Sequence, residues 1–116
     1  MARALRFGPA LVWALVIFLL SHQPSGAFPS VPLPGLDKIA HAVAYGVLAL
    51  LLAFGAGFPV RAPSWSWVVA VAAYGVSDEW HQTFVPGRSW ETWDLLADAG
   101  GSLLALAWAR RYSARR

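Results

Sequence analysis

Ionisable and hydrogen-bonding side chains recur every four residues in three separate segments of this chain. Residues four apart lie on one face of an α-helix, so each set would form a polar stripe along a helix. The three sets are Asp37, His41 and Tyr45; Tyr74, Asp78 and Gln82; and Asp94, Asp98 and Ser102. Carboxylates and imidazoles are common acids and bases in enzymes, so these stripes are the first candidates for chemistry.

The candidates for acid–base catalysis are Asp78, Glu79 and His41. Two neighbouring carboxylates oppose each other's ionisation, so that one can donate a proton while the other accepts one. Histidine titrates near neutrality, so His41 is a candidate proton carrier or ligand. A purely structural role is the alternative for His41, with a hydrogen bond to Asp37 or to an acid on the helix that carries Asp78.

Seven further residues are candidates for binding a ligand at the same end of the helices. They are Asp37, Lys38, Tyr45, Gln82, Arg88, Asp94 and Asp98. Arg88 can hold a phosphate or carboxylate with two parallel hydrogen bonds. The alternative roles are structural: Lys38 or Arg88 would pair with Asp78 and Glu79, or Arg88 would pair with Glu91 or Asp94.

Two of these acids have a simple local explanation, and a third does not. Asp37 and Asp94 stand near the expected starts of helices and are predicted to be N-caps. Asp98 lies one turn further in and caps nothing, and facing lipid tails would cost it roughly 2.5–3.5 kcal/mol. At a rise of about 1.5 Å per residue, His41, Asp78 and Asp98 each lie about 6 Å below the outer end of their helix. We therefore expect the three groups to meet at one level inside a bundle.

No metal or cofactor is predicted from the sequence. The chain has no Cys, and it lacks the closely spaced His or Asp pairs that are typical of metal ligands. It also lacks a Gly-rich phosphate loop and a nucleophile elbow. Nucleic acid is excluded as a partner, because the basic residues lie at the chain ends and in short loops and form no stripe.

The composition is that of a membrane protein. Hydrophobic residues make up 58% of the 116 residues and charged residues 13%, whereas soluble domains have about 25% charged residues. Apolar segments predict helices over about 5–21, 37–55, 65–84 and 93–111. The segment Val85–Arg88, with Pro86 and Gly87 at its centre, predicts a type II turn. We therefore expect one all-α domain over 1–116, a bundle of four transmembrane helices.

The distribution of Lys and Arg predicts how this bundle is oriented. Seven basic residues fall on the side of the chain ends and two, Lys38 and Arg88, on the other. The seven are Arg3, Arg6, Arg61, Arg110, Arg111, Arg115 and Arg116. Because basic loops stay in the cytoplasm, both termini are expected to be cytoplasmic. A cleaved signal peptide is the alternative for the first segment, since Ser25-Gly26-Ala27 offers small residues for cleavage.

Three motifs resemble the VanZ-like family of small bacterial membrane proteins. They are Asp37-Lys38-x-x-His41-x-x-x-Tyr45, Ser77-Asp78-Glu79-x-x-Gln82-x-Phe84-x-Pro86-Gly87-Arg88 and Asp94-x-x-x-Asp98-x-x-Gly101. The resemblance covers about residues 37–109. It implies a cell-envelope location and a link to glycopeptide (teicoplanin) resistance, but no particular reaction. Asp98 is a departure, because the family pattern more often has Asn there.

Three functions are consistent with these residues. The favoured hypothesis is a multi-pass protein of the bacterial cytoplasmic membrane that binds an envelope component or amphiphilic drug at the outer leaflet. Its partners would be membrane lipids and a lipid-linked cell-wall precursor or a glycopeptide. The alternative is an intramembrane hydrolase or transferase acting on lipid-linked headgroups. A proton-coupled transporter is less favoured, since the inner halves of the helices lack polar residues to complete a path. The oligomeric state stays open.

Overall fold

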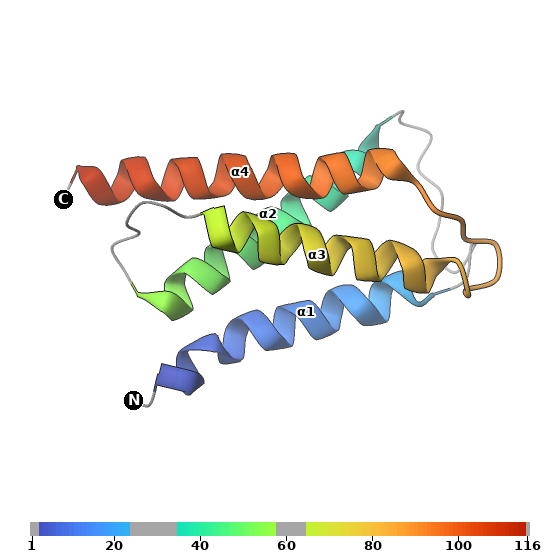
Figure 1. The fold of residues 1–116 in the computed structure, drawn as a ribbon, viewed down its shortest axis with the longest axis horizontal. Coiled ribbons are helices and arrows are strands. Elements are labelled where there is room, and N and C mark those ends of the chain that lie inside the picture. The colour runs from blue at the N-terminus through green and yellow to red at the C-terminus, as the bar shows by residue number, and fades with distance from the viewer. Residues whose placement is uncertain (1–2, 24–34, 58–64, 116) are drawn as a thin grey trace.

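The computed structural model describes residues 3–23, 35–57 and 65–115, and these form helices and short connections without any strand. Four α-helices run along the long axis of the molecule (Figure 1). They are α1 (Gly8–Ser21), α2 (Leu36–Ala56), α3 (Trp65–Gln82) and α4 (Thr92–Ala114), and a 3₁₀ turn, η1 (Arg3–Phe7), precedes α1. The all-helical fold predicted from the sequence is therefore confirmed.

The helix ends differ from the expected positions in ways that local chemistry explains. The first helix, expected over 5–21, opens as the 3₁₀ turn and becomes α-helical around Pro9, whose missing N–H is tolerated in a first turn. The third helix ends at Gln82, two residues early. The N–H groups of Phe84 and Val85 there donate to carbonyls three residues back, which tightens the chain into a turn.

Both N-cap predictions are wrong. Gly35 is the N-cap of α2, with a φ of 80° that suits glycine, and the Asp37 carboxylate accepts a hydrogen bond from Lys38. Glu91 is the N-cap of α4, and Asp94 is buried in the first turn. The expected turn before α4 is confirmed, because Gly87 has a φ of 75° and the Arg88 N–H donates to the Val85 carbonyl at 3.0 Å.

Helices α2 and α4 form the most extensive helix pair of the bundle. Gly101 of α4 lies so close to α2 that a Cβ atom added to it would be 2.1 Å from the Ala42 carbonyl oxygen. Gly46 of α2 faces Gly101 in turn, with 3.1 Å between its added Cβ and the Gly101 oxygen. Small residues such as these let helix backbones approach this closely.

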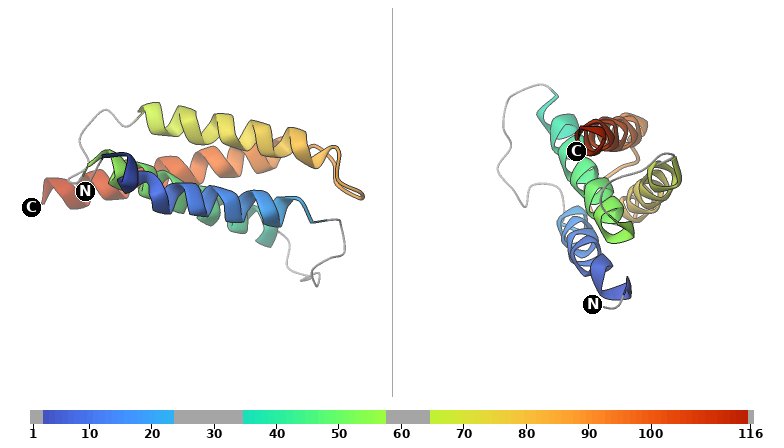
Figure 2. Two further views of the ribbon diagram at one scale, coloured as in Figure 1. Left: turned by 90° about the horizontal axis from the view of Figure 1, so that it is seen from below. Right: turned by 90° about the vertical axis from the view of Figure 1, so that its left-hand side faces the viewer.

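Helix α1 lies beside α2 and α3 (Figure 2) and is joined to both by hydrogen bonds. The Trp13 indole N–H donates to the Ala44 carbonyl of α2 at 2.8 Å, and the Tyr74 hydroxyl of α3 donates to the Ala14 carbonyl. The buried apolar core next to these bonds draws on all four helices and includes Ile17, Leu48, Val71 and Leu106.

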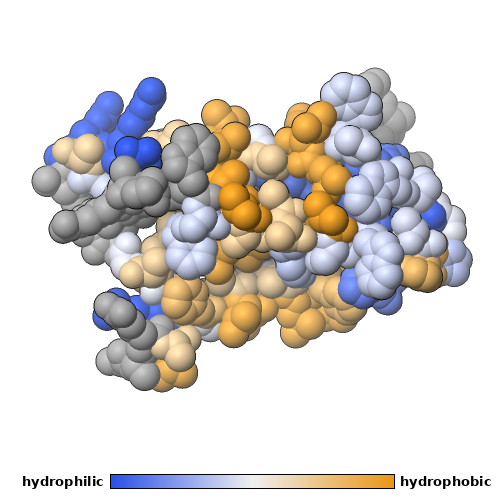
Figure 3. All heavy atoms as spheres, viewed as in Figure 1, coloured by the Kyte–Doolittle hydropathy of each residue, from blue (hydrophilic) through white to orange (hydrophobic). Residues whose placement is uncertain are grey.

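On the face seen in Figure 3, apolar residues cover the middle of the molecule and more hydrophilic residues lie toward its two ends. Among the described residues, two segments are long and apolar enough to cross a membrane, Ala4–Ser21 and Leu36–Ala56, with mean hydropathies of 1.9 and 2.0. Large apolar side chains are nevertheless exposed on α3 and α4 as well, for example Val69, Val76, Leu96 and Leu104. Exposed apolar surface of this extent is rare on soluble monomers.

Candidate functional site

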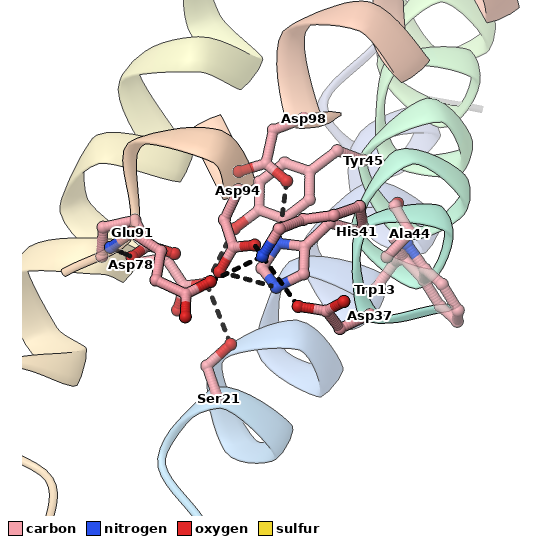
Figure 4. Close-up of polar contacts among 12 residues, drawn as sticks. Trp13, Ser21, Asp37, His41, Ala44, Tyr45, Asp78, Glu91, Asp94 and Asp98 are labelled. Carbon is pink, nitrogen blue, oxygen red and sulfur yellow. Dashed lines mark hydrogen bonds and ion pairs between the residues drawn. The ribbon is translucent and has the colours of Figure 1, made fainter. Parts of the chain in front are cut away.

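Polar side chains from all four helices converge at one end of the bundle, where α1 and α3 end and α2 and α4 begin (Figures 1 and 4). The helices carry buried polar residues here because the polar stripes face inward. The buried side chains at this end are Asp78, Glu79, Gln82, Asp94 and Asp98. Burying so many carboxylates is costly unless each has a partner that donates a hydrogen bond or carries a positive charge.

Lys38 neutralises the outermost acids. Its ammonium group lies 2.7 Å from an oxygen of Asp37 and 2.6 Å from oxygens of both Glu91 and Asp94. These ion pairs link the first turn of α2 to the first turn of α4. The alternative role of Lys38, an ion pair with the α3 carboxylates, is therefore wrong.

His41 lies between two acids of α4. Its Nδ1 is 3.0 Å from Oδ1 of Asp98, and its Nε2 is 3.6 Å from Oδ2 of Asp94. Neither Asp37 nor an α3 acid is its hydrogen-bond partner, so the pairing given as the alternative for His41 is wrong. The reason is the close packing of α2 on α4 through Gly101, which turns the polar face of α2 toward α4.

Asp78 is held by neutral donors from two other helices. Its Oδ2 accepts hydrogen bonds from the Ser21 hydroxyl of α1 and from the Tyr45 hydroxyl of α2, each at 2.9 Å. The Tyr45 ring lies parallel to the His41 ring, with 6.1 Å between centroids. The hydrogen-bonded pairs His41–Asp98 and Tyr45–Asp78 thus lie next to each other, in contact through the rings of His41 and Tyr45 (Figure 4). The alternative role of Asp78, an ion pair with Lys38 or Arg88, is absent from the described structure.

Glu79 points to α4 and not to the partners of Asp78. Its side chain is fully buried, and its Oε2 accepts a hydrogen bond from the Glu91 backbone N–H at 3.0 Å. One oxygen each of Asp78, Glu79 and Asp98 has no hydrogen-bond partner among the described residues. The two adjacent carboxylates of α3 therefore have different surroundings, and the alternative role of Glu79, an ion pair with Lys38 or Arg88, is wrong.

A pocket of about 380 Å³ opens beside these residues, between the C-terminal half of α1 and the N-terminal half of α2. Apolar side chains form most of its wall, and Ser21, His41, Tyr45, Gln82 and Arg88 form its polar part. The Arg88 Nε–H donates to the Gln23 carbonyl at 3.0 Å, so the expected ion pair of Arg88 with Glu91 or Asp94 is wrong. Arg88 lines the pocket instead.

A comparison with known protein families identifies the family of this chain. The model of the VanZ/LLP1 family matches residues 7–112, which is nearly the whole chain. This protein belongs to the VanZ/LLP1 family. The resemblance derived from the sequence motifs is confirmed, and family membership together with the two apolar helices indicates a membrane protein. No curated protein and no solved structure matches the chain.

Two residues of this VanZ/LLP1 site were not among the predicted site residues. Ser21 is the last residue of α1 and donates to Asp78, and Glu91 supplies both a backbone N–H to Glu79 and a carboxylate to Lys38. A lone hydroxyl at the end of an apolar helix is a weak signal for Ser21. The role of the Glu91 N–H carries no sequence signal, because every residue except proline has that group.

Proposed function

We propose that this VanZ/LLP1 protein binds an amphiphilic component of the cell envelope, or an amphiphilic drug, in the pocket between α1 and α2. The main support is the pocket itself. It has an apolar wall that includes Ile17, Leu20 and Ala44, and a polar end that includes His41 and Arg88. Its volume of about 380 Å³ falls in the usual range of ligand sites, roughly 300–1,000 Å³. An acyl or isoprenoid chain suits the wall, and a polar headgroup suits the end.

The charge of the polar end favours an anionic headgroup. Arg88 is the cationic residue in the pocket lining, whereas Lys38 is surrounded by three carboxylates. A guanidinium has N–H donors beyond the one that bonds Gln23, and phosphates and carboxylates are the groups it binds best. A lipid-linked cell-wall precursor carries such a headgroup. A glycopeptide such as teicoplanin is the drug that the family association favours.

The same proposal includes four spans in the bacterial cytoplasmic membrane, with both termini cytoplasmic and the polar site toward the outer leaflet. The excess of Lys and Arg on the side of the chain ends supports this orientation, although Arg61 and Arg116 lie outside the described residues. Helix α1 begins and α4 ends at the same end of the bundle (Figure 1), as an even number of spans requires.

Ligand binding tests the proposal directly. Purified protein in detergent micelles is titrated with a lipid-linked cell-wall precursor and, separately, with teicoplanin. Removing a charged hydrogen-bond donor costs about 1.5–3 kcal/mol, so Arg88→Ala should weaken binding of one of the two by roughly 10- to 100-fold. Arg110→Ala removes an exposed arginine at the other end of α4 and should leave binding unchanged. Equal binding by wild type and Arg88→Ala, or no binding of either probe, would contradict the proposal.

A hydrolase or transferase acting on lipid-linked headgroups is the second candidate function, with His41, Asp78 and Glu79 as its acid–base groups. The observation that favours it is His41, which lines the pocket and has its Nδ1 bonded to the buried Asp98. A carboxylate in that position orients an imidazole for proton transfer. Mass spectrometry of the precursor after the same incubation separates the two functions, because only the enzyme releases a headgroup.

A further inference from the structure

We infer that His41, Glu79 and Asp94 together bind one divalent transition-metal cation. The three residues come from three different helices, α2, α3 and α4, and one ligand atom of each lies within 4.8 Å of the other two. An imidazole and two carboxylates are ligands that Zn²⁺ and similar cations accept. This inference does not depend on what the pocket binds.

The orientation of His41 suits a metal ligand. Asp98 lies 3.0 Å from Nδ1, and a carboxylate there favours the tautomer that carries its proton on Nδ1, which leaves a lone pair on Nε2. Ligating histidines are held in this way in metal sites. The Nε2 to Asp94 Oδ2 distance of 3.6 Å is long for a hydrogen bond. It is close to the roughly 3.4 Å between two ligands of a tetrahedral site with bonds of about 2.1 Å.

The surroundings of the Glu79 carboxylate independently point to a bound cation. The side chain is fully buried, its Oε2 is fixed by the Glu91 N–H, and its Oε1 has no hydrogen-bond partner among the residues that the structure describes. A buried carboxylate oxygen without a donor is costly. A cation bound between Glu79, His41 and Asp94 would supply the missing positive charge.

The charges around the site agree with this assignment. Four carboxylates are buried at this end: Asp78, Glu79, Asp94 and Asp98. Within the described parts of the chain, Lys38 is the only Lys or Arg that forms an ion pair with any of them, and it reaches Asp94 alone. Lys38 also occupies the neighbouring acidic group at the surface, formed by Asp37, Glu91 and Asp94. In the buried group, the Lys38 ammonium contacts Oδ1 of Asp94, and among the described residues no Lys or Arg pairs with Glu79.

Zinc titration of the whole protein tests the inference. Tag-free protein in detergent is treated with a chelator, dialysed and titrated with ZnCl₂ by calorimetry, with MgCl₂ as the comparison cation. We expect about one Zn²⁺ per chain. Glu79→Gln and Asp94→Asn should weaken binding by at least about 10-fold, and Asp98→Ala, which removes the partner of His41, by about 10- to 100-fold.

Two matched variants control for other sites. His22→Gln removes an exposed imidazole next to the end of α1, so it should bind Zn²⁺ like the wild type. His81→Gln should also bind normally, and loss of binding there would instead assign the ion to the neighbouring rings of His22 and His81.

Thermal unfolding of the same proteins provides the second measurement. Zn²⁺ should raise the unfolding midpoint of the wild type and of His22→Gln, because a cation that binds only the folded state stabilises it. It should not raise the midpoint of Glu79→Gln. If that variant does not fold, the wild-type titration still decides. No saturable Zn²⁺ binding by the wild type, or equal binding by Glu79→Gln, Asp94→Asn and the wild type, overturns the inference.

Discussion

Asp98 connects three helices through a single buried carboxylate. Its Oδ1 lies 3.0 Å from His41 Nδ1 of α2. Its Oδ2 occupies space next to Gly75 of α3, where an added Cβ atom would come within 2.8 Å of it. Gly75 is therefore the residue that makes room for the acid. Oδ2 of Asp98 has no hydrogen-bond partner among the described residues, and a cation at the proposed site would offset this buried negative charge.

Tyr45→Phe tests the hydrogen bond between Tyr45 and Asp78. The variant removes the hydroxyl that donates to Asp78 at 2.9 Å and leaves a buried carboxylate with one donor fewer. We expect the free energy of unfolding to fall by about 1–3 kcal/mol, because an unsatisfied buried group costs that much. Unfolding in mixed detergent micelles, followed by Trp fluorescence, measures it.

A double-mutant cycle with Asp78→Asn is the control for the Tyr45 prediction. A buried neutral amide loses less stabilisation than a buried carboxylate when its hydrogen-bond donor, the Tyr45 hydroxyl, is removed. The cost of Tyr45→Phe should therefore shrink in the Asp78→Asn background, and strictly additive costs would show that the hydrogen bond contributes nothing measurable.

The pairing of α2 with α4 decides which polar groups meet. Gly101 and Gly46 bring the two helices into close contact, and this contact turns His41 and Lys38 toward the acids of α4. Helix α3 lies on the other side of the site and contributes Asp78 and Glu79, while α1 contributes Ser21. The site is thus shared among helices, and a change in one helix contact should disturb it from a distance.

Gly101→Ala tests this helix contact, and the adjacent Gly100→Ala is its matched control. A methyl group at Gly101 would lie 2.1 Å from the Ala42 carbonyl oxygen, whereas one at Gly100 would meet nothing within 4 Å. Gly101→Ala should destabilise the protein by about 1–3 kcal/mol or more through overpacking. Gly100→Ala should be neutral or slightly stabilising, because Ala is favoured over Gly in helices.

The same denaturation measurement, together with ligand or Zn²⁺ binding by both glycine variants, checks this prediction. Gly101→Ala should bind more weakly as well as unfold more readily, since the packing of α2 on α4 positions His41. Equal stability of the two variants would contradict the close contact.

The face of the molecule seen in Figure 3 has an apolar middle and more hydrophilic ends, and the two ends differ in the residues they carry. One end carries the buried acids and the exposed aromatic residues Trp80, Trp90 and Trp93; the other carries Arg110 and Arg111. Aromatic residues collect at membrane interfaces and basic residues on the cytoplasmic side. This asymmetry supports the proposed orientation, with α3 and α4 crossing the membrane although each contains acids.

Single cysteines test the proposed topology, because the chain has none of its own. Thr83→Cys and Ser66→Cys place exposed thiols at opposite ends of α3, and Ala114→Cys places one at the end of α4. A membrane-impermeant maleimide should label Thr83→Cys in intact bacterial cells. The other two should react only after the membrane is permeabilised, and the unmodified protein never.

Equal labelling of Thr83→Cys and Ser66→Cys in intact cells would show that α3 does not cross the membrane. The proposal of four spans would then be wrong, and at most the two strongly apolar helices would remain as spans.

The sequence by itself determined the helices, their polar faces and the family. These depend on local periodicity and composition: residues four apart share a face whatever surrounds the helix, which is why Asp37, His41 and Tyr45 could be assigned to one stripe. The glycine turn before α4 followed from backbone sterics in the same way. The sequence did not predict the ion-pair partners of Lys38, the hydrogen-bond partner of Arg88 or the N-caps of α2 and α4.

Only the tertiary structure decided which polar stripe faces which neighbouring helix. Asp78 and Glu79 are adjacent in sequence, yet one accepts from Ser21 and Tyr45 and the other from the Glu91 backbone. The positions along the chain do not encode the rotation of each helix about its axis. That rotation is set by packing between distant residues, above all by the approach of Gly101 to Ala42. The grouping of His41, Glu79 and Asp94 across three helices follows from that packing.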